Sequence, residues 1–355
     1  MIAEFFRVKF ETIKELVMKS RQIIVALFVA AFVAISALPP VFAGDPARTG
    51  TAGGVQVLVP VGARDLGMGG ANIAYTSGLE AAYWNPAGLS MLDRRASAQF
   101  STMQMFNDIR VNYAGIGVQA GRLGNLAFTF KAFDFGEIPV TTLEDPDGES
   151  GATFSPAFAT IGLTYSKMLT DAISFGVTGK VVHEEAPRVK ASAAAFDMGL
   201  QYRGLGGVNG LSVGLAVKNI GTDMKYDGSA LLDENNFTAP DIQSDELPAS
   251  IEMAVGYRYN INESNSFIAA GNFQNNNLGN DVIRLGGEFN YGDFIFLRGG
   301  YLAGSDIDSD AQLYRYTAGV GLNLDVNGTA LMVDYAFRDS QYFDGNHLFS
   351  LTLGF

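Results

Sequence analysis

The stretch that decides the fold is A-S-I-E-M-A-V-G-Y-R, residues 249–258, in which every second side chain is apolar. The same pattern recurs in three further segments, 211–218, 331–338 and 349–355. Successive side chains of a β-strand point to opposite faces of the sheet, so each segment has one apolar face and one polar or glycine face. The sequence therefore indicates an all-β fold.

Strands of this kind are expected along most of residues 96–355. They lie near 96–105, 111–120, 124–134, 160–169, 172–184, 192–203, 211–219, 247–259, 266–273, 281–290, 293–301, 314–324, 328–337 and 346–355. Alternation by itself is typical both of a soluble sandwich and of a transmembrane barrel, so it leaves the two open.

The lengths of the connections distinguish these two folds. Short connections follow the even-numbered strands, whereas the longest ones, 135–159, 220–246 and 302–313, all follow odd-numbered strands. Outer-membrane barrels have short periplasmic turns and long external loops, and a sandwich has no reason to sort its loops in this way. We therefore expect an antiparallel transmembrane β-barrel of about 14 strands in the bacterial outer membrane, spanning 96–355 and surrounded by outer-membrane lipid.

Composition excludes several other classes of protein. After Leu38 no stretch reaches the roughly 18 unbroken apolar residues of a transmembrane helix. The absence of cysteine from all 355 residues rules out disulfides, thiolate metal sites and a cysteine-linked lipid anchor. A net charge of −13 argues against a nucleic-acid partner, because phosphates attract basic surfaces.

The N-terminus has the features of a secretory signal peptide. Lys19 and Arg21 precede an apolar run, residues 23–38, and the small-residue pattern ending at Ala43 is typical of a cleavage site. We expect a signal peptide at 1–43, with Met18 as the possible true start. An uncleaved anchor helix is the alternative, although consecutive prolines end the apolar run early.

Residues 44–95 do not alternate and are rich in glycine. Irregular backbone at membrane depth must be shielded from lipid, so we expect this segment to form an N-terminal plug, or hatch, inside the barrel. Glycines on the inward faces of the strands would leave room for it, at Gly162, Gly176, Gly199 and Gly214.

Charged side chains within the strands are expected to face the lumen. An Arg or Lys facing lipid at mid-depth would cost about 2–4 kcal/mol. The predicted lumen charges are Lys131, Lys180, Asp197, Arg203, Lys218, Glu252, Arg258, Arg284, Glu288, Arg298 and Asp334. We expect them mainly to pair with one another, since a filled lumen needs neutralised charges. A charged path through the barrel is the alternative.

The chain ends with apolar side chains at every second position, Phe349, Leu351, Leu353 and Phe355. This ending resembles the C-terminal signal by which barrels are recognised for insertion. It makes the barrel-assembly machinery an expected partner.

Two motifs near the N-terminus carry a family resemblance. The stretch GARDLGMGGA, residues 62–71, is followed by WNPAGL, residues 84–89. Together they resemble the N-terminus of the PorV/PorQ family, itself akin to the FadL-type long-chain fatty acid transporters. The residues that match the hatch motif are Gly67, Gly69, Gly70, Trp84, Asn85, Pro86 and Ala87. Further segments similar to this family are 211–221, 247–249, 285–289 and 297–301.

The resemblance implies a 14-stranded barrel with a plug and, for the PorV branch, a role in type IX secretion. Such a barrel binds the C-terminal domains of secreted proteins and passes them to the surface attachment machinery. Loops 135–159 and 220–246 are then the expected contact surface. The alternative is a FadL-like transporter of hydrophobic small molecules, which would pass the hatch around 85–87, and a barrel without traffic is a third possibility.

Catalytic motifs are not expected to function here. Residues 210–214, GLSVG, fit the nucleophile pattern of hydrolases, but alternation continues through them where a sharp turn is needed. We therefore expect no enzyme, no catalytic residues, no cofactor and no metal site. One alternative stays open, a calcium site in the acidic loop 305–310, although that loop lacks the features of an EF-hand.

Overall fold

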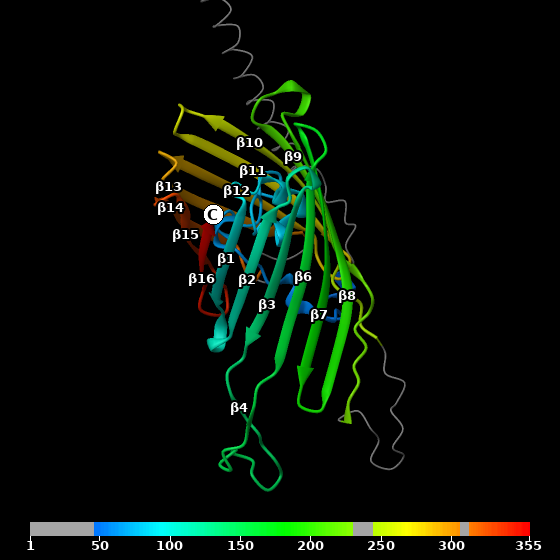
Figure 1. The fold of residues 1–355 in the computed structure, drawn as a ribbon. Coiled ribbons are helices and arrows are strands. Elements are labelled where there is room, and N and C mark those ends of the chain that lie inside the picture. The colour runs from blue at the N-terminus through cyan, green and yellow to red at the C-terminus, as the bar shows by residue number, and fades with distance from the viewer. Residues whose placement is uncertain (1–45, 230–243, 306–311) are drawn as a thin grey trace, which may run out of the picture. The chain divides into compact units, whose positions relative to one another are not determined.

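The computed structural model describes residues 46–229, 244–305 and 312–355, so the predicted signal peptide and start site lie outside the described residues. Fourteen antiparallel strands close into a barrel, each paired with its neighbours along the chain and the last with the first (Figure 1). The predicted fold class, an all-β transmembrane barrel with an N-terminal plug, is confirmed. No helix among the described residues is long and apolar enough to cross a membrane.

The barrel strands agree with their predicted positions to within about three residues. They are β1 Ala96–Gln104, β2 Arg110–Gln119, β3 Asn125–Asp134, β6 Ala157–Met168, β7 Ile173–Ala186, β8 Val189–Arg203, β9 Leu211–Gly221, β10 Ser250–Asn260, β11 Ser266–Asn276, β12 Val282–Tyr291, β13 Ile295–Gly304, β14 Tyr316–Val326, β15 Thr329–Arg338 and β16 Asn346–Gly354. Two short strands were not predicted, β4 Ile138–Pro139 and β5 Thr153–Phe154, which form a two-stranded sheet in the loop after β3.

Closure of the barrel depends on β1 and β16. Their register pairs Phe100 with Leu351 and Thr102 with Phe349. Beyond the ladder, backbone hydrogen bonds in both directions join Ala96 to Phe355. The C-terminal segment that carries the predicted assembly signal therefore forms one side of the closing seam.

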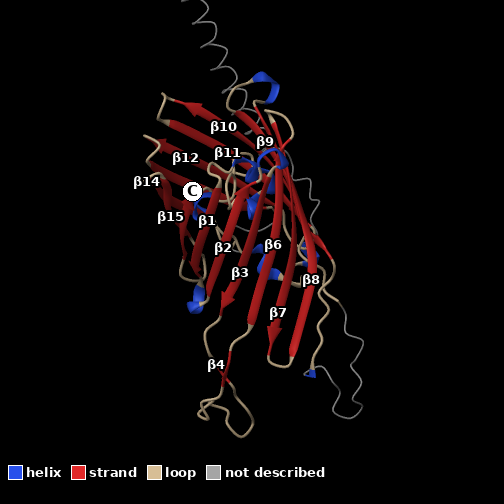
Figure 2. Cartoon of the chain, viewed as in Figure 1, coloured by secondary structure: helices blue, strands red, loops and turns tan. Residues whose placement is uncertain are grey.

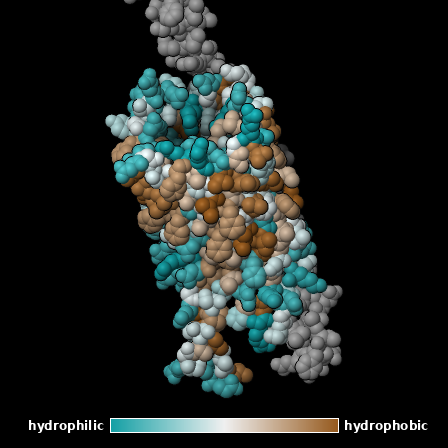
Figure 3. Space-filling model, viewed as in Figure 1, coloured by the Kyte–Doolittle hydropathy of each residue, from teal (hydrophilic) through white to brown (hydrophobic). Residues whose placement is uncertain are grey.

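The outer surface of the barrel carries a belt of exposed apolar side chains. It includes Phe100, Ile116, Phe128, Leu163, Val181, Phe196, Leu215, Ile251, Leu297 and Leu351. On the face that Figure 3 shows, brown apolar atoms gather in the middle of the barrel, between hydrophilic ends. Such a belt on a closed barrel fits the hydrocarbon core of a bilayer, so the protein spans the outer membrane with its strands.

The connections sort by length between the two ends of the barrel. Every connection at the end that also holds the C-terminus is short, from two residues, Asn327-Gly328 between β14 and β15, to seven, 204–210 between β8 and β9. The opposite end also has a two-residue turn, Pro187-Arg188 between β7 and β8. The long connections after β3 and β9 lie at the opposite end (Figure 1). We call these the inner, periplasmic end and the outer, extracellular end.

The hatch, residues 46–95, consists of five short helices and their connections. These are η1 Pro46–Arg48, η2 Val55–Leu58, α2 Ala63–Gly67, α3 Ala81–Trp84 and η3 Pro86–Met91. Figure 2 shows these helices in blue, surrounded by the red strands of the wall. Three further single turns of 3-10 helix lie between strands, η4 Phe106–Asp108, η5 Gly121–Leu123 and η6 Leu205–Gly207.

Glycines of the wall let the hatch approach the strands. A Cβ atom at Gly199 would lie 2.0 Å from Oδ1 of Asn85, and one at Gly176 would lie 2.3 Å from the Pro86 carbonyl. At Gly214 it would lie 2.6 Å from the Ile73 carbonyl oxygen. A fourth predicted glycine, Gly162, differs, because its nearest neighbour is the Thr129 hydroxyl of the adjacent strand.

We predict that Leu163→Arg, in the middle of β6, destabilises the barrel by about 2–4 kcal/mol, because the charge would enter the lipid core. Leu163 is 60% exposed on the outer face. Urea unfolding in phospholipid vesicles measures the change. The matched control is Leu143→Arg in the outer loop after β3, where the side chain is 98% exposed. Equal stability of the two variants would show that Leu163 does not face lipid.

Candidate functional site

The hatch divides the lumen into separate cavities. The outer vestibule is a cavity of about 370 Å³ on the extracellular side. Its apolar and aromatic lining includes Val57, Leu58, Pro60, Leu66, Tyr83, Trp84, Leu302, Leu313 and Tyr314. Two adjoining cavities, which share lining residues such as Arg64, Ser77 and Asp93, lie on the periplasmic side, the Glu80 chamber of about 470 Å³ and the arginine chamber of about 620 Å³. The vestibule shares no lining residue with either chamber, so the hatch separates them.

Asn85 of the predicted hatch motif ties the hatch to itself and to the wall. Its Oδ1 accepts a hydrogen bond from the Ala87 amide at 3.2 Å and so caps η3, with Pro86 as the first residue of that helix. Its Nδ2 donates to the carbonyls of Ile73, at 2.9 Å, and Leu200, at 3.3 Å. A fully buried side-chain amide whose hydrogen bonds are all made is a strong positional constraint.

The three glycines of the motif allow close approaches. Gly69 and Gly70 have φ values of 67° and 74°, a conformation that other residues rarely adopt. A Cβ atom at Gly70 would lie 2.5 Å from the ring of Trp84, and one at Gly67 would lie 3.2 Å from Cα of Gly319. Trp84 is itself anchored, because its Nε1 donates to the Val61 carbonyl at 2.9 Å.

Glycines on β12 to β14, whose role was not predicted, complete this contact. A Cβ atom at Gly286 would lie 2.3 Å from the Met68 carbonyl oxygen, and one at Gly300 would lie 2.4 Å from the Gly69 amide. Helix α2 therefore lies flush against the wall. Both glycines fall in the segments that resemble the PorV/PorQ family, but the sequence pattern does not reveal their contact with the hatch.

A chain of ion pairs, which we call the latch network, joins α2 to three strands. Arg64 donates from Nε and Nη2 to the two carboxylate oxygens of Glu288, each at 3.1 Å. Arg298 donates to Glu288 at 2.7 Å and to Asp334 at 2.5 Å, and its side chain is completely buried. Arg64 is the member contributed by the hatch, so movement of the hatch must break its pair with Glu288.

Two further ion-pair groups occupy the lumen. Glu252 accepts from Arg284 at 3.2 Å and lies 3.5 Å from the Lys218 ammonium. That ammonium lies 4.2 Å from the ring centroid of Tyr83 and 5.6 Å from that of Trp84. Lys218 thereby links the wall to the aromatic floor of the outer vestibule.

The second group sits at an irregularity of the wall. Lys180 pairs with Asp197 at 2.8 Å. The ladder between β8 and β9 shifts register beside Asp197, and Asn219 adopts a positive φ of 61° there. The Asn219 amide donates to Asp197 Oδ1 at 2.7 Å, so the carboxylate also stabilises this bulge.

The remaining predicted lumen charges contact the hatch or groups bound to it. Lys131 donates to the carbonyls of Gln56, at 2.8 Å, and Val59, at 3.0 Å. Arg203 donates to Gln201 at 3.2 Å, and Arg258 lies 5.0 Å from the ring centroid of Tyr75. Most of the predicted lumen charges thus pair with one another or contact the hatch, while Arg258 is exposed at the periplasmic end.

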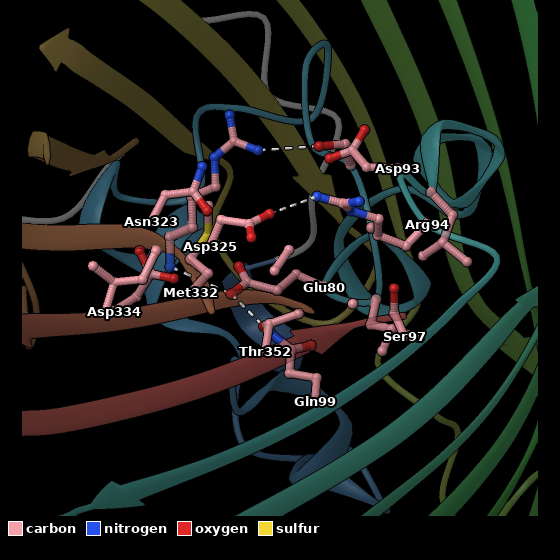
Figure 4. A pocket seen from close by; sticks show the side chains of 18 of the residues that line it. Glu80, Asp93, Arg94, Ser97, Gln99, Asn323, Asp325, Met332, Asp334 and Thr352 are labelled. Atoms are coloured by element: carbon pink, nitrogen blue, oxygen red, sulfur yellow. Dashed lines mark hydrogen bonds and ion pairs between the residues drawn. The ribbon is translucent and has the colours of Figure 1, made fainter. Parts of the chain in front are cut away.

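Glu80 is a buried carboxylate of the hatch that was not predicted (Figure 4). It accepts hydrogen bonds from the amides of Arg64, at 3.4 Å, and Asp65, at 3.2 Å, and from Gln99 Nε2 at 3.1 Å. Burial raises the pKa of Glu80 to about 8, and the negative charges of Asp65 and Asp334 act in the same direction. Arg64 and Glu80 precede the first strand, so the alternation that identifies lumen charges could not reveal them.

The structure also locates the motifs that were considered for catalysis and metal binding. Leu211 to Gly214 continue straight along β9, so the sharp turn of a hydrolase nucleophile is missing there. Among the described residues, no group of three His, Cys, Asp or Glu side chains could hold a metal ion. Residues 306–310 of the acidic loop considered for calcium, 305–310, lie outside the described residues.

No family model matches the chain, and no curated protein matches it. Solved structures do match. The CymD monoaromatic hydrocarbon channel and the Pseudomonas putida toluene transporter TodX are each 12% identical, with TM-scores of 0.52 over 83% of this chain and 97% of theirs. The Ralstonia pickettii toluene transporter TbuX is 13% identical, with a TM-score of 0.52 over 83% of this chain and 98% of its own.

This chain shares their fold. At 12–13% identity the likeness extends to the outer-membrane barrel architecture alone. Nothing in these comparisons supports the resemblance to the PorV/PorQ family or a role in type IX secretion, which stay predictions from sequence motifs.

We predict that Arg64→Gln weakens hatch docking by about 2–5 kcal/mol, because Glu288 loses one of its two partners in a buried site. Conductance of the barrel in planar bilayers should then show more frequent opening. The control is Arg94→Gln, which breaks an exposed pair with Asp325 at the same end of the barrel. Unchanged conductance in Arg64→Gln would mean that the latch network does not hold the hatch.

We also predict that hatch docking weakens with rising pH. The pKa of Glu80 is raised in the docked hatch, so its contribution is complete below the ordinary carboxyl value of 4.5 and is lost as pH rises through about 8. The urea concentration at the midpoint of hatch undocking, followed by the fluorescence of Trp84, should decrease as the pH is raised from 5 to 9. Glu80→Gln should flatten this dependence, and Glu149→Gln in an exposed loop should not. An equally steep dependence in Glu80→Gln would contradict the assignment.

Proposed function

We propose that this protein is an outer-membrane channel for hydrophobic small molecules, which enter the outer vestibule and pass the hatch. The observation that carries the proposal is the composition of the vestibule. Its floor is formed by hatch side chains that include Leu58, Tyr83 and Trp84, and Leu302 and Tyr314 contribute to its walls. Much of the remaining lining is polar and includes Lys218, Glu252, Arg284 and Arg338, so the concave site combines an apolar, aromatic floor with polar groups that can orient a small molecule.

The solved structures of the same fold support this proposal. CymD is described as a monoaromatic hydrocarbon channel, and TodX and TbuX as toluene transporters. A vestibule of about 370 Å³ lies within the range of small-molecule sites and has room for a single aromatic ring. Monoaromatic hydrocarbons are therefore the first compounds to test.

Passage requires the hatch to move. The vestibule and the periplasmic chambers are separate, and α2 lies between them, because its Leu66 lines the vestibule and its Arg64 lines both chambers. The latch network and the glycine contacts then set the free-energy cost of opening. Substrate that fills the vestibule contacts Tyr83 and Trp84 of the hatch directly. Its binding can therefore shift the equilibrium between the closed and the open hatch.

Escort of secreted proteins has no structural observation in its favour. Of the two loops expected to contact such cargo, 135–159 contains the small sheet of β4 and β5. The other, 220–246, lies partly outside the described residues. That role, with its secreted-protein, attachment and assembly partners, stays a prediction.

Trp84 makes the proposal directly testable, because it is the only tryptophan of the chain and lines the vestibule. Titration of the purified barrel with toluene should change its emission in a saturable manner, and Trp84→Phe, which removes the fluorophore, gives the background. A linear response, identical to that of free indole, would count against a binding site in the vestibule.

Transport itself can be tested with a reversible lock. The chain has no cysteine, and the Ala63 amide lies 2.9 Å from the Ser350 hydroxyl, so Ala63→Cys with Ser350→Cys would place a disulfide between hatch and wall. Intact cells that express this variant should take up labelled toluene after reduction and lose uptake after oxidation. Equal uptake in both states would exclude passage by hatch movement, and each single cysteine variant controls for the oxidant.

A further inference from the structure

Two lumen arginines have no acidic partner. Arg203 and Arg258 form no ion pair with any described carboxylate, in contrast to Arg64 and Arg298 of the latch network. The Nε of Arg203 is buried without a hydrogen-bond partner. The protein supplies no acceptor for this donor, and Arg203 lines a cavity through which an acceptor can reach it.

Residues of the hatch position both arginines. Gln201 donates from Nε2 to the carbonyls of Ile73, at 3.1 Å, and Thr76, at 2.9 Å, and its Oε1 accepts from Arg203. On the other side, the Arg258 guanidinium lies against the ring of Tyr75. The Tyr75 hydroxyl in turn donates to the Gly210 carbonyl at 2.5 Å. The hatch segment 73–76 therefore orients one guanidinium through Gln201 and the other by direct ring contact.

The two guanidinium groups face one cavity. Both line the arginine chamber, which lies at the periplasmic end among the turns that follow β8, β10 and β12. Asp93 and Asp293 also line it without pairing with either arginine, and Asp293 accepts a hydrogen bond from Asn290. Guanidinium groups offer several donors each and match the oxygens of carboxylate and phosphate groups.

We propose that Arg203 and Arg258 form a binding site for an oxyanion, a carboxylate or phosphate group, which is complete only while the hatch segment 73–76 is seated. This site lies on the periplasmic side of the hatch and is separate from the outer vestibule. Anion binding and docking of the hatch segment 73–76 against the wall are thermodynamically linked. An anion bound here therefore stabilises the closed hatch, and opening of the hatch releases the anion. The anion would thus regulate opening from the periplasmic side.

Inorganic phosphate is the probe. The purified full-length barrel in a neutral detergent should bind it saturably by isothermal titration calorimetry at constant ionic strength. Arg203→Gln and Arg258→Gln should each weaken binding by about tenfold or more, since each removes a charge-assisted contact. Arg94→Gln, at the same end of the barrel, should leave binding unchanged. Heat-modifiable migration on gels confirms that each variant is folded.

Dependence on the hatch is the second part of the test. Tyr75→Leu keeps both arginines but removes the ring beside Arg258, and it should weaken phosphate binding. Phosphate should also raise the urea concentration at which the fluorescence of Trp84 reports hatch undocking, and Arg258→Gln should remove this effect. Vesicles of phosphatidylglycerol in place of phosphate distinguish a lipid headgroup from a free anion as the source of the oxyanion.

Two results would overturn the proposal. One is absence of saturable binding of both phosphate and phosphatidylglycerol. The other is binding that Arg94→Gln weakens as much as Arg203→Gln does, because this would mean general attraction to positive charge. Neither result bears on toluene uptake, so the proposed transport function stands or falls separately.

Discussion

Pairing of β1 with β16 is the interaction on which the rest of the structure depends. Hydrocarbon offers no hydrogen-bond partners, so every backbone group of a transmembrane strand must be satisfied by another strand. The seam between these two strands removes the last free edges of the sheet. Only inside such a closed wall can an irregular segment such as 46–95 lie at membrane depth, and only there can ion pairs such as Arg298 with Asp334 be kept away from lipid.

The hatch is held by two kinds of contact with different physical roles. Glycines of the wall, such as Gly199 and Gly300, permit close packing but contribute little attraction of their own. Directional groups supply the attraction, above all Asn85 and Arg64. Close packing excludes water from the contact, and the low dielectric then strengthens each hydrogen bond and ion pair. Stability of the closed state thus arises from shape and charge together.

The wall could be predicted from sequence because its physics is local. A period of two places apolar side chains toward lipid, and a charge such as Glu252 or Asp334 then has to face the lumen. Contacts of the hatch could not be predicted in this way, because Arg64 and Glu288 are separated by most of the chain and no periodicity connects them. Residues 44–95 were recognised as a plug because they fail to alternate. Their partners, the helix boundaries within the plug and the small sheet of β4 and β5 required the three-dimensional structure.

The position of the hatch in the chain has a consequence for biogenesis. Residues 46–95 precede β1, yet they contact strands as late in the chain as β15 and β16. The segment that emerges first must therefore wait for the last strands before its partners exist. An early hatch with buried charges and no enclosing wall is poorly suited to remain folded alone. The hatch precedes every strand of the barrel in the chain, and its contacts are complete only when the seam closes around it.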